Sequence, residues 1–138
     1  MNALISLPFR FAPRSPLFYL IFWLIWCTVL WVLSSRPPSH DEPPPIPHFD
    51  KILHFGYFAC GAILTTGAMI NLGKKNLSLP KIVIIAFVIG AFVGAIDEYH
   101  QSMVPGRFGN DPWDWIADCL GSIAGSVAML WGWRKWKT

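Results

Sequence analysis

Ionisable side chains are grouped in three short stretches of this sequence, each at the edge of an apolar segment: DKILHF (50–55), DEYHQ (97–101) and DPWDWIAD (111–118). An imidazole and carboxylates can pass a proton to or from a reacting group, and lysine and arginine can hold a phosphate or a carboxylate. Ionisable residues inside apolar segments are costly, so these groups mark a candidate functional site.

The spacing of these residues places them on continuous helix faces, because positions three and four apart share a face. In each segment the polar residues continue into small ones, which allow membrane helices to approach closely, so we expect the three faces to meet in one polar pocket. The three faces are Lys51, His54, Phe58, Gly61, Thr65 and Ala68; Gly90, Gly94, Asp97 and Gln101, with Glu98 beside them; and Asp111, Asp114, Asp118, Gly121 and Gly125.

Roles follow from the side-chain chemistry. We expect His54, Glu98, Asp114 and Asp97 to act as catalytic groups, and Lys51, Gln101, Arg107, Asp118 and Asp111 to bind substrate. Structural roles are the alternative for four of them. Asp111 and Asp114 also fit the first turn of a helix, where carboxylates cap free N–H groups. Lys51 also fits a lysine that snorkels to the interface, and Arg107 a loop ion pair.

A cofactor is not identified by the sequence. Histidine with carboxylate oxygens suits zinc or a harder divalent cation, but neither an HExxH pattern nor paired cysteines occur, so a divalent metal is possible and not favoured, and no metal ligand is assigned. Neither a GxSxG elbow nor a P-loop is present, which gives no obvious nucleophile. The odd number of cysteines, each in or near an apolar run, argues against a disulfide framework.

The elements that must position these residues are membrane-spanning helices. Hydrophobic residues make up 54% of the 138 residues and charged residues only 14%, which is too apolar for an ordinary soluble domain. The predicted fold class is therefore all-α, a polytopic bundle of four transmembrane helices, each near the ~20 residues that a bilayer core requires. The apolar segments run from 16 to 33, 52 to 70, 81 to 103 and 113 to 133. The first is expected to be a retained anchor and not a cleaved signal.

Topology follows from the lysine and arginine bias of the short connections. With four spans, residues 1–15, the loop that carries Lys74, Lys75 and Lys81, and the basic tail 134–138 lie on one side, which should be cytoplasmic. The proline-rich loop 34–49 and the three polar stretches then face outward. The net charge of +3 comes mainly from these topology signals, so a nucleic-acid partner is not expected.

Three motifs in order, DKILHFGYF, DEYHQSMVPGR and DWIADCLGSIAG, resemble the VanZ-like membrane protein family, named for a teicoplanin-resistance accessory protein. The resemblance covers about 50–125 and implies that 50–133 is a VanZ-like core with three transmembrane helices. It implies functional positions at Lys51, His54, Glu98, Gln101, Arg107, Asp114, Gly121 and Gly125. Many members have asparagine at the position of Asp118. The resemblance also implies a bacterial cytoplasmic membrane and an envelope role, including glycopeptide resistance of the teicoplanin type.

Three classes of function remain open on these observations. The polar set fits phosphate or acyl chemistry on a lipid-linked or phosphate-bearing envelope substrate. The same groups could bind or transport an envelope lipid or precursor without turnover, although four short spans without an internal repeat argue against alternating access. A purely structural polar network is the third possibility. The lipid bilayer is the expected partner in each case, and the oligomeric state is undetermined.

Overall fold

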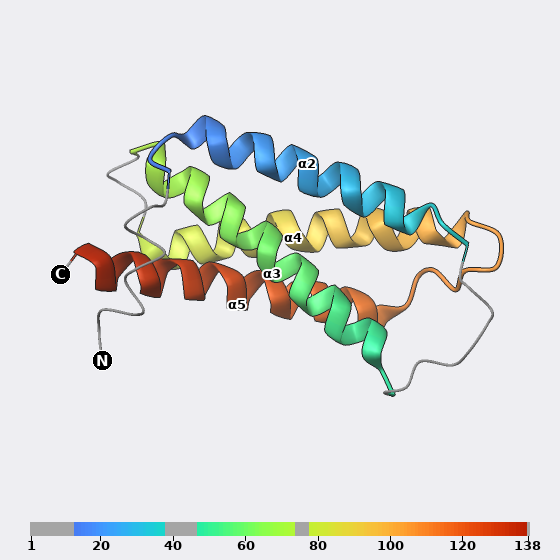
Figure 1. Ribbon diagram of the computed structural model, residues 1–138. Coiled ribbons are helices and arrows are strands. Elements are labelled where there is room, and N and C mark those ends of the chain that lie inside the picture. Colours follow the sequence, from blue (N-terminus) through green and yellow to red (C-terminus); the bar gives the residue numbers. More distant parts are fainter. Residues whose placement is uncertain (1–12, 38–46, 74–77, 138) are drawn as a thin grey trace.

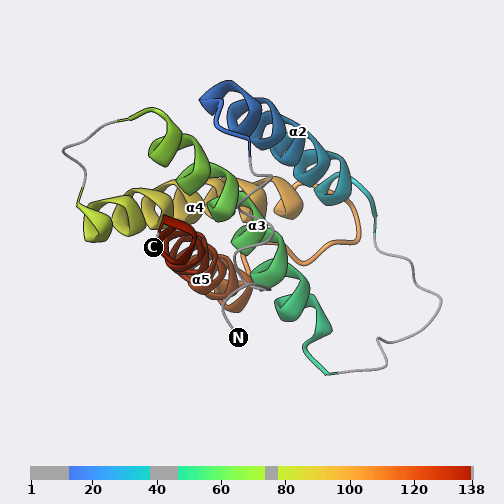
Figure 2. The same ribbon diagram turned by 60° about the vertical axis from the view of Figure 1, so that its left-hand side comes forward.

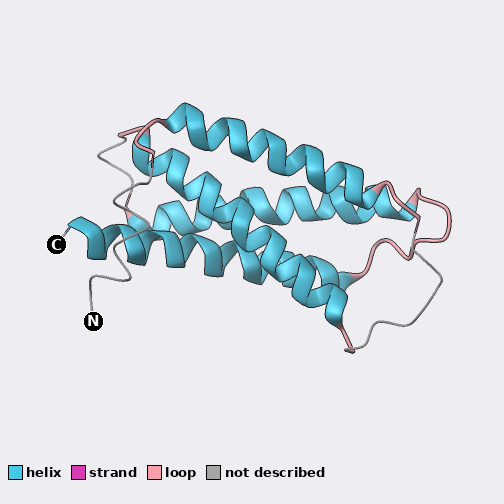
Figure 3. Cartoon of the chain, viewed as in Figure 1, coloured by secondary structure: helices cyan, strands magenta, loops and turns pink. Residues whose placement is uncertain are grey.

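The computed structural model of the chain describes residues 13–37, 47–73 and 78–137 (Figure 1). The predictions for residues 1–12, for 38–46 of the proline-rich loop, and for Lys74 and Lys75 lie outside these residues. Within the described ranges the structure contains helices and connecting loops but no strand (Figure 3).

Each of the four helices is long and apolar enough to cross a membrane. This confirms the predicted all-α fold class and a multi-pass membrane protein. The helices are α2 (Pro16–Ser34), α3 (Phe49–Asn71), α4 (Leu79–Ser102) and α5 (Pro112–Lys137).

α3, α4 and α5 begin one to three residues before the predicted apolar segments, whereas α2 begins at the same residue, Pro16. α3 starts at Phe49, so that Lys51 is part of its first turn, and α4 starts at Leu79. α2 and α4 have proline in the first turn, and α5 begins at Pro112. Proline fits there because its fixed φ matches the helix and its missing N–H would have no partner in any case. The polar stretches therefore lie on helix ends and not in the loops.

Successive helices run in alternating directions, so the start of α3, the end of α4 and the start of α5 lie at one end of the bundle (Figure 1). α5 packs against α3 and α4, while α2 packs against α3 and touches α4 from the outside (Figure 2). Large apolar side chains face outward, among them Leu17, Ile84 and Phe92. The interior holds small polar groups such as Thr66, whose hydroxyl donates to Ser126 Oγ at 2.9 Å. An arrangement with large apolar side chains outside and small polar ones inside is typical of helices packed in lipid.

Glycines on α5 bring its backbone against that of α3. A Cβ built at Gly121 would lie 2.2 Å from the carbonyl oxygen of Phe55, and one at Gly125 would lie 2.1 Å from that of Ala59. Those distances leave no room for any side chain. The small-residue face of α5 is therefore in direct backbone contact with α3.

The predicted contact between the small-residue faces of α4 and α5 is confirmed, because Gly94 lies against Asp118. The face of α3 departs from the prediction at Gly61, which packs under the indole of Trp26 from α2. The first helix takes this position because the flat indole ring fills the hollow that a missing Cβ leaves.

We predict that Gly121→Ala lowers the stability of the folded chain by roughly 1–3 kcal/mol, because its methyl group meets the rigid backbone of α3. Gly56→Ala is the matched control, since a Cβ there meets no atom within 4 Å and alanine favours the helix. Thermal unfolding of the detergent-solubilised chain measures both. Equal melting temperatures for the two variants would contradict the close contact.

Candidate functional site

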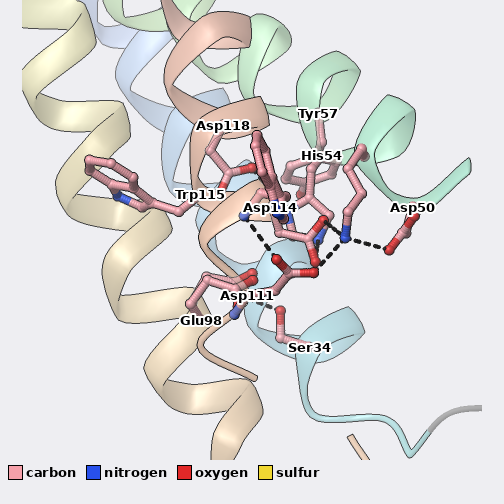
Figure 4. Close-up of polar contacts among 12 residues, drawn as sticks. Ser34, Asp50, His54, Tyr57, Glu98, Asp111, Asp114, Trp115 and Asp118 are labelled. Atoms are coloured by element: carbon pink, nitrogen blue, oxygen red, sulfur yellow. Dashed lines mark hydrogen bonds and ion pairs between the residues drawn. The ribbon is translucent and has the colours of Figure 1, made fainter. Parts of the chain in front are cut away.

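Polar residues from α3, α4 and α5 converge at the end of the bundle where these helices start or finish (Figure 4). His54 comes from α3, Glu98 from α4, and Asp114 and Asp118 from α5. Glu98, Asp114 and Asp118 are buried. The structure therefore brings together residues that the sequence places in three separate stretches.

Lys51 is the cation at the centre of an acidic group. Its Nζ lies 2.6 Å from Asp111 Oδ2, 2.9 Å from Asp114 Oδ1 and 2.9 Å from Asp50 Oδ2. The hydrogen bond from Lys51 holds the pKa of Asp111 below its usual range. The carboxylate of Asp111 also accepts a hydrogen bond from the N–H of Trp113 at 2.8 Å. Asp111 therefore caps the start of α5 in addition to pairing with Lys51.

His54 is oriented by Asp118. The Nδ1–H group of His54 donates to Asp118 Oδ1 at 2.9 Å, which leaves Nε2 free for other contacts, with Asp114 Oδ2 4.0 Å away. Asp118 has no exposed surface, and its Oδ2 has no hydrogen-bond partner among the described residues. A carboxylate in this position fixes both the tautomer and the orientation of an imidazole.

Glu98 is held by the loop that joins α4 to α5. The N–H of Asp111 donates to Glu98 Oε2 at 2.7 Å, and the N–H of Asn110 donates to the Glu98 carbonyl oxygen at 3.3 Å. The loop can fold back so closely because Gly109 lies against the backbone of Ser102, where a Cβ would be 2.1 Å from N, and because Asn110 accepts a positive φ of 61°. The other oxygen, Oε1, is buried without a hydrogen-bond partner among the described residues.

Asp97 connects the site to α2. The hydroxyl of Ser34 donates to Asp97 Oδ1, and Gln101 Nε2 donates to Asp97 Oδ2 at 2.7 Å. The sequence pattern places no candidate site residue in the first helix, so Ser34 is identified only by the structure. No local pattern identifies it, because a serine at the end of an apolar segment is common. Trp31 of α2 also stacks on His100, with ring centroids 3.7 Å apart, in line with a packing role for that histidine.

Arg107 binds the end of α2. Its Nη1 donates to the carbonyl oxygens of Leu33 and Ser34, each at 2.9 Å, and more weakly to that of Arg36. These carbonyls are at or just beyond the last turn of α2, where a cation is favourable. The structure thus shows a structural role for Arg107 at the end of α2. Its expected role in substrate binding stays a prediction.

A cavity of about 590 Å³ opens between α2 and α3 next to this cluster. One part of its wall is apolar, and the other consists of site residues. The apolar part includes Leu30, Leu33, Ile52, Leu53 and Tyr57, and the polar part includes Ser34, Asp50, His54, Asp97, Gln101 and Arg107. Lys51, Glu98, Asp111, Asp114 and Asp118 do not line the cavity but surround its polar residues.

Among the described residues, His54, Asp97 and Glu98 could hold a metal ion, because one potential ligand atom from each lies within 4.8 Å of the others.

No protein-family model, curated protein or solved structure matches this chain. The resemblance to VanZ-like proteins therefore stays a prediction from three sequence motifs.

Lys51→Met should destabilise the fold at neutral pH by about 1–2 kcal/mol, because it leaves the carboxylates of Asp111 and Asp114 without their cation. The pKa of Asp111 is lowered in the folded state, so its contribution is complete above the ordinary aspartate pKa of about 3.9 and is lost as the pH falls through the folded-state value.

The difference in melting temperature between the two proteins should therefore stay constant from about pH 7 to about pH 4 and shrink only as the pH falls below about 4. Lys81→Met, which removes an exposed lysine at the far end of the bundle, is the control and should melt like the unmodified chain. A difference that is absent at neutral pH, or that does not change with pH, would contradict the role of Lys51.

Proposed function

We propose that this protein binds an amphiphilic, phosphate-bearing compound of the bacterial cell envelope, such as a lipid-linked precursor, and transfers protons on its polar head group. The cavity between α2 and α3 is the observation that carries this proposal. Its wall joins an apolar surface, suited to a hydrocarbon chain, to a set of ionisable residues suited to a head group.

The position of the cavity favours a ligand that arrives from the lipid. Leu33, Ile52 and Leu53 line it, and each is about half exposed on the outer surface of the bundle. In a bilayer such side chains face hydrocarbon, so a lipid tail could enter between the helices without crossing a polar barrier. A fully water-soluble substrate would gain nothing from this apolar wall.

The polar end can hold and protonate a head group. His54 keeps Nε2 free because Asp118 takes Nδ1, and Glu98 keeps one unpartnered oxygen in a buried site. All three carbonyl contacts of Arg107 use Nη1, which leaves its other N–H groups to hold a phosphate oxygen. We assign proton transfer to His54, which lines the cavity, together with Glu98, which lies behind the cavity wall with a ligand atom within 4.8 Å of one of His54, and anion binding to Arg107.

We further propose that the polar cluster faces the outside of the cytoplasmic membrane, with both termini in the cytoplasm. The opposite end of the bundle carries Arg14, Lys81, Arg134 and Lys135, as the bias of basic residues toward the cytoplasm requires. Lys51 and Arg107, at the cluster end, are engaged with carboxylates and with helix carbonyls, which explains their presence on the outer side.

The three-motif resemblance to VanZ-like proteins supports an envelope role and a contribution to resistance against glycopeptides of the teicoplanin type. All three motifs contribute residues to the cluster: Lys51 and His54 from the first, Glu98 from the second and Asp114 from the third. The family's positions thus coincide with the groups that we assign to the head group.

Binding or transport without turnover is the second candidate function, and the hydrogen bonds of the nearby serines favour it. The hydroxyl of Ser34 donates to Asp97, that of Ser102 to the Tyr99 carbonyl, and that of Ser122 to the Asp118 carbonyl. Ser102 and Ser122 therefore have no general base beside them, and Ser35, whose Oγ lies 3.4 Å from His100 Nε2, does not line the cavity. Among these four serines only Ser34 faces a carboxylate, and because that carboxylate, Asp97, also accepts from Gln101, we assign no serine nucleophile.

Comparing envelope lipids and lipid-linked precursors tests the function. We expect a compound to accumulate in cells that lack the protein and in cells that carry only Glu98→Gln, because the amide cannot transfer the proton that Glu98 would. Cells restored with the unmodified protein or with Tyr99→Phe, which changes an exposed side chain next to Glu98 that does not line the cavity, should not accumulate it.

Membrane levels of all three proteins must be matched for this comparison. Identical lipid profiles in every strain would contradict the catalytic proposal. A compound that binds the unmodified protein and not Glu98→Gln, with no new product in either case, would instead support the binding function.

Cysteine labelling tests the orientation. In a background with Cys27, Cys60 and Cys119 replaced by alanine, we expect a membrane-impermeant thiol reagent to label Ser39→Cys in intact cells and Asn76→Cys only after permeabilisation. Permeabilised cells provide the control that both positions can react. Labelling of Asn76→Cys but not Ser39→Cys in intact cells would reverse the orientation and remove the outward-facing site.

A further inference from the structure

We propose that His54, Asp97 and Glu98 form a binding site for one divalent transition-metal ion. This inference rests on the geometry and burial of the three residues. It therefore goes beyond the proposed lipid substrate and does not depend on it.

The spacing of the three side chains fits a shared ion. One potential ligand atom from each lies within 4.8 Å of the others. Nitrogen and oxygen ligands bonded to one ion at about 2.0–2.2 Å are themselves some 3–4 Å apart. The observed limit of 4.8 Å exceeds that separation by about 1–2 Å, a difference that side-chain rotations can supply.

Each of the three residues is also held by a neighbour in the way that metal ligands are. Asp118 accepts the Nδ1–H of His54, and the N–H of Asp111 binds Glu98 Oε2. Both contacts orient the side chain and leave another atom free, Nε2 in the histidine and Oε1 in the glutamate. Such outer hydrogen bonds are the usual companions of metal-bound imidazole and carboxylate.

Asp97 is supported in the same way. Ser34 and Gln101 donate to its two oxygens, and each carboxylate oxygen keeps a second lone pair for a cation. Both donors are neutral. They orient Asp97 but do not compensate its charge.

Burial supplies the independent reason for an ion. Glu98 is only 4% exposed, and its Oε1 has no hydrogen-bond partner among the described residues. Asp97 is 5% exposed and adjacent in sequence. The two nearby cations contact other groups: Lys51 contacts three other carboxylates, and Nη1 of Arg107 contacts carbonyl oxygens at the end of α2. Two neighbouring buried carboxylates without a cation are costly, and an ion removes that cost.

The ligand set indicates the kind of ion. One imidazole nitrogen with two carboxylate oxygens suits zinc or manganese better than calcium or magnesium, which prefer oxygen ligands alone. Three protein ligands leave at least one coordination position open. His54 and Asp97 also line the cavity, so the open position can receive a phosphate oxygen of a bound ligand.

Metal binding would change the roles within the cluster. An ion would use lone pairs of His54 and Glu98, and Asp114, whose Oδ2 is 4.0 Å from His54 Nε2, would remain as a carboxylate able to transfer a proton.

Isothermal titration of the full chain in detergent with Zn²⁺ alone and with Mn²⁺ alone tests the site. The protein should carry no histidine tag and should have Cys27, Cys60 and Cys119 replaced by alanine, because thiolates bind zinc. We expect one ion per chain for at least one of the two metals, with a micromolar or lower Kd. His54→Ala and Glu98→Gln should weaken binding at least tenfold, and Asp118→Asn, which removes only the outer support, by roughly 10–100-fold.

His100→Ala is the matched control for His54→Ala, because it removes a histidine outside the proposed ligands and outside the cavity wall and should leave the Kd unchanged. A metal-dependent rise in the melting temperature of the unmodified chain, reversed by EDTA, gives a readout that needs no variant. Absence of saturable binding by both metals, or equal affinity of the unmodified chain, His54→Ala and Glu98→Gln, would overturn the proposal. The lipid comparison with Glu98→Gln would then still decide the proposed function separately.

Discussion

The close approach of α5 to α3 and α4 is the contact on which the rest of the structure depends. Gly121 and Gly125 place the backbone of α5 on that of α3, and Gly94 lets Asp118 lie directly against α4. Lipid provides little hydrophobic force between helices, so packing of this kind and hydrogen bonds must hold the bundle together. Asp118 and Asp114 lie one and two turns before Gly121 on α5. The close packing of α5 on α3 therefore also places their carboxylates near His54.

The charged groups at this end of the bundle form two sets of ion pairs. Lys51 compensates three carboxylates, while His54 pairs with Asp118. Asp97 and Glu98 receive only neutral hydrogen bonds within the described residues. A structural network would gain nothing from leaving these two acids without a cation, since buried uncompensated charge opposes folding. This imbalance supports the proposal that the cluster binds a cation.

α2 forms one wall of the cavity and is attached to the site through its end. Ser34 binds Asp97, Arg107 binds the last carbonyls of the helix, and Trp26 exchanges hydrogen bonds with Tyr57. α2, which the sequence predicts only as a membrane anchor, therefore also supplies part of the cavity wall beside the polar cluster. An amphiphile held there would have its tail beside α2 and its head group beside His54 and Asp97.

The sequence by itself determined the four apolar helices and the gathering of the three polar stretches at one end of the bundle. Both follow from local properties, the length of each apolar run and the three- and four-residue spacing of polar and small residues such as Asp118 and Gly121. The tertiary structure alone decided that Ser34 binds Asp97, that Arg107 binds α2, and that Asp111 holds Glu98 through its backbone. These partners depend on which helix lies beside which and on the path of a loop that folds back at Gly109. Residue spacing predicts the helix face on which a side chain lies. It does not predict which residue of another helix or loop will contact that side chain, because this depends on how the helices pack.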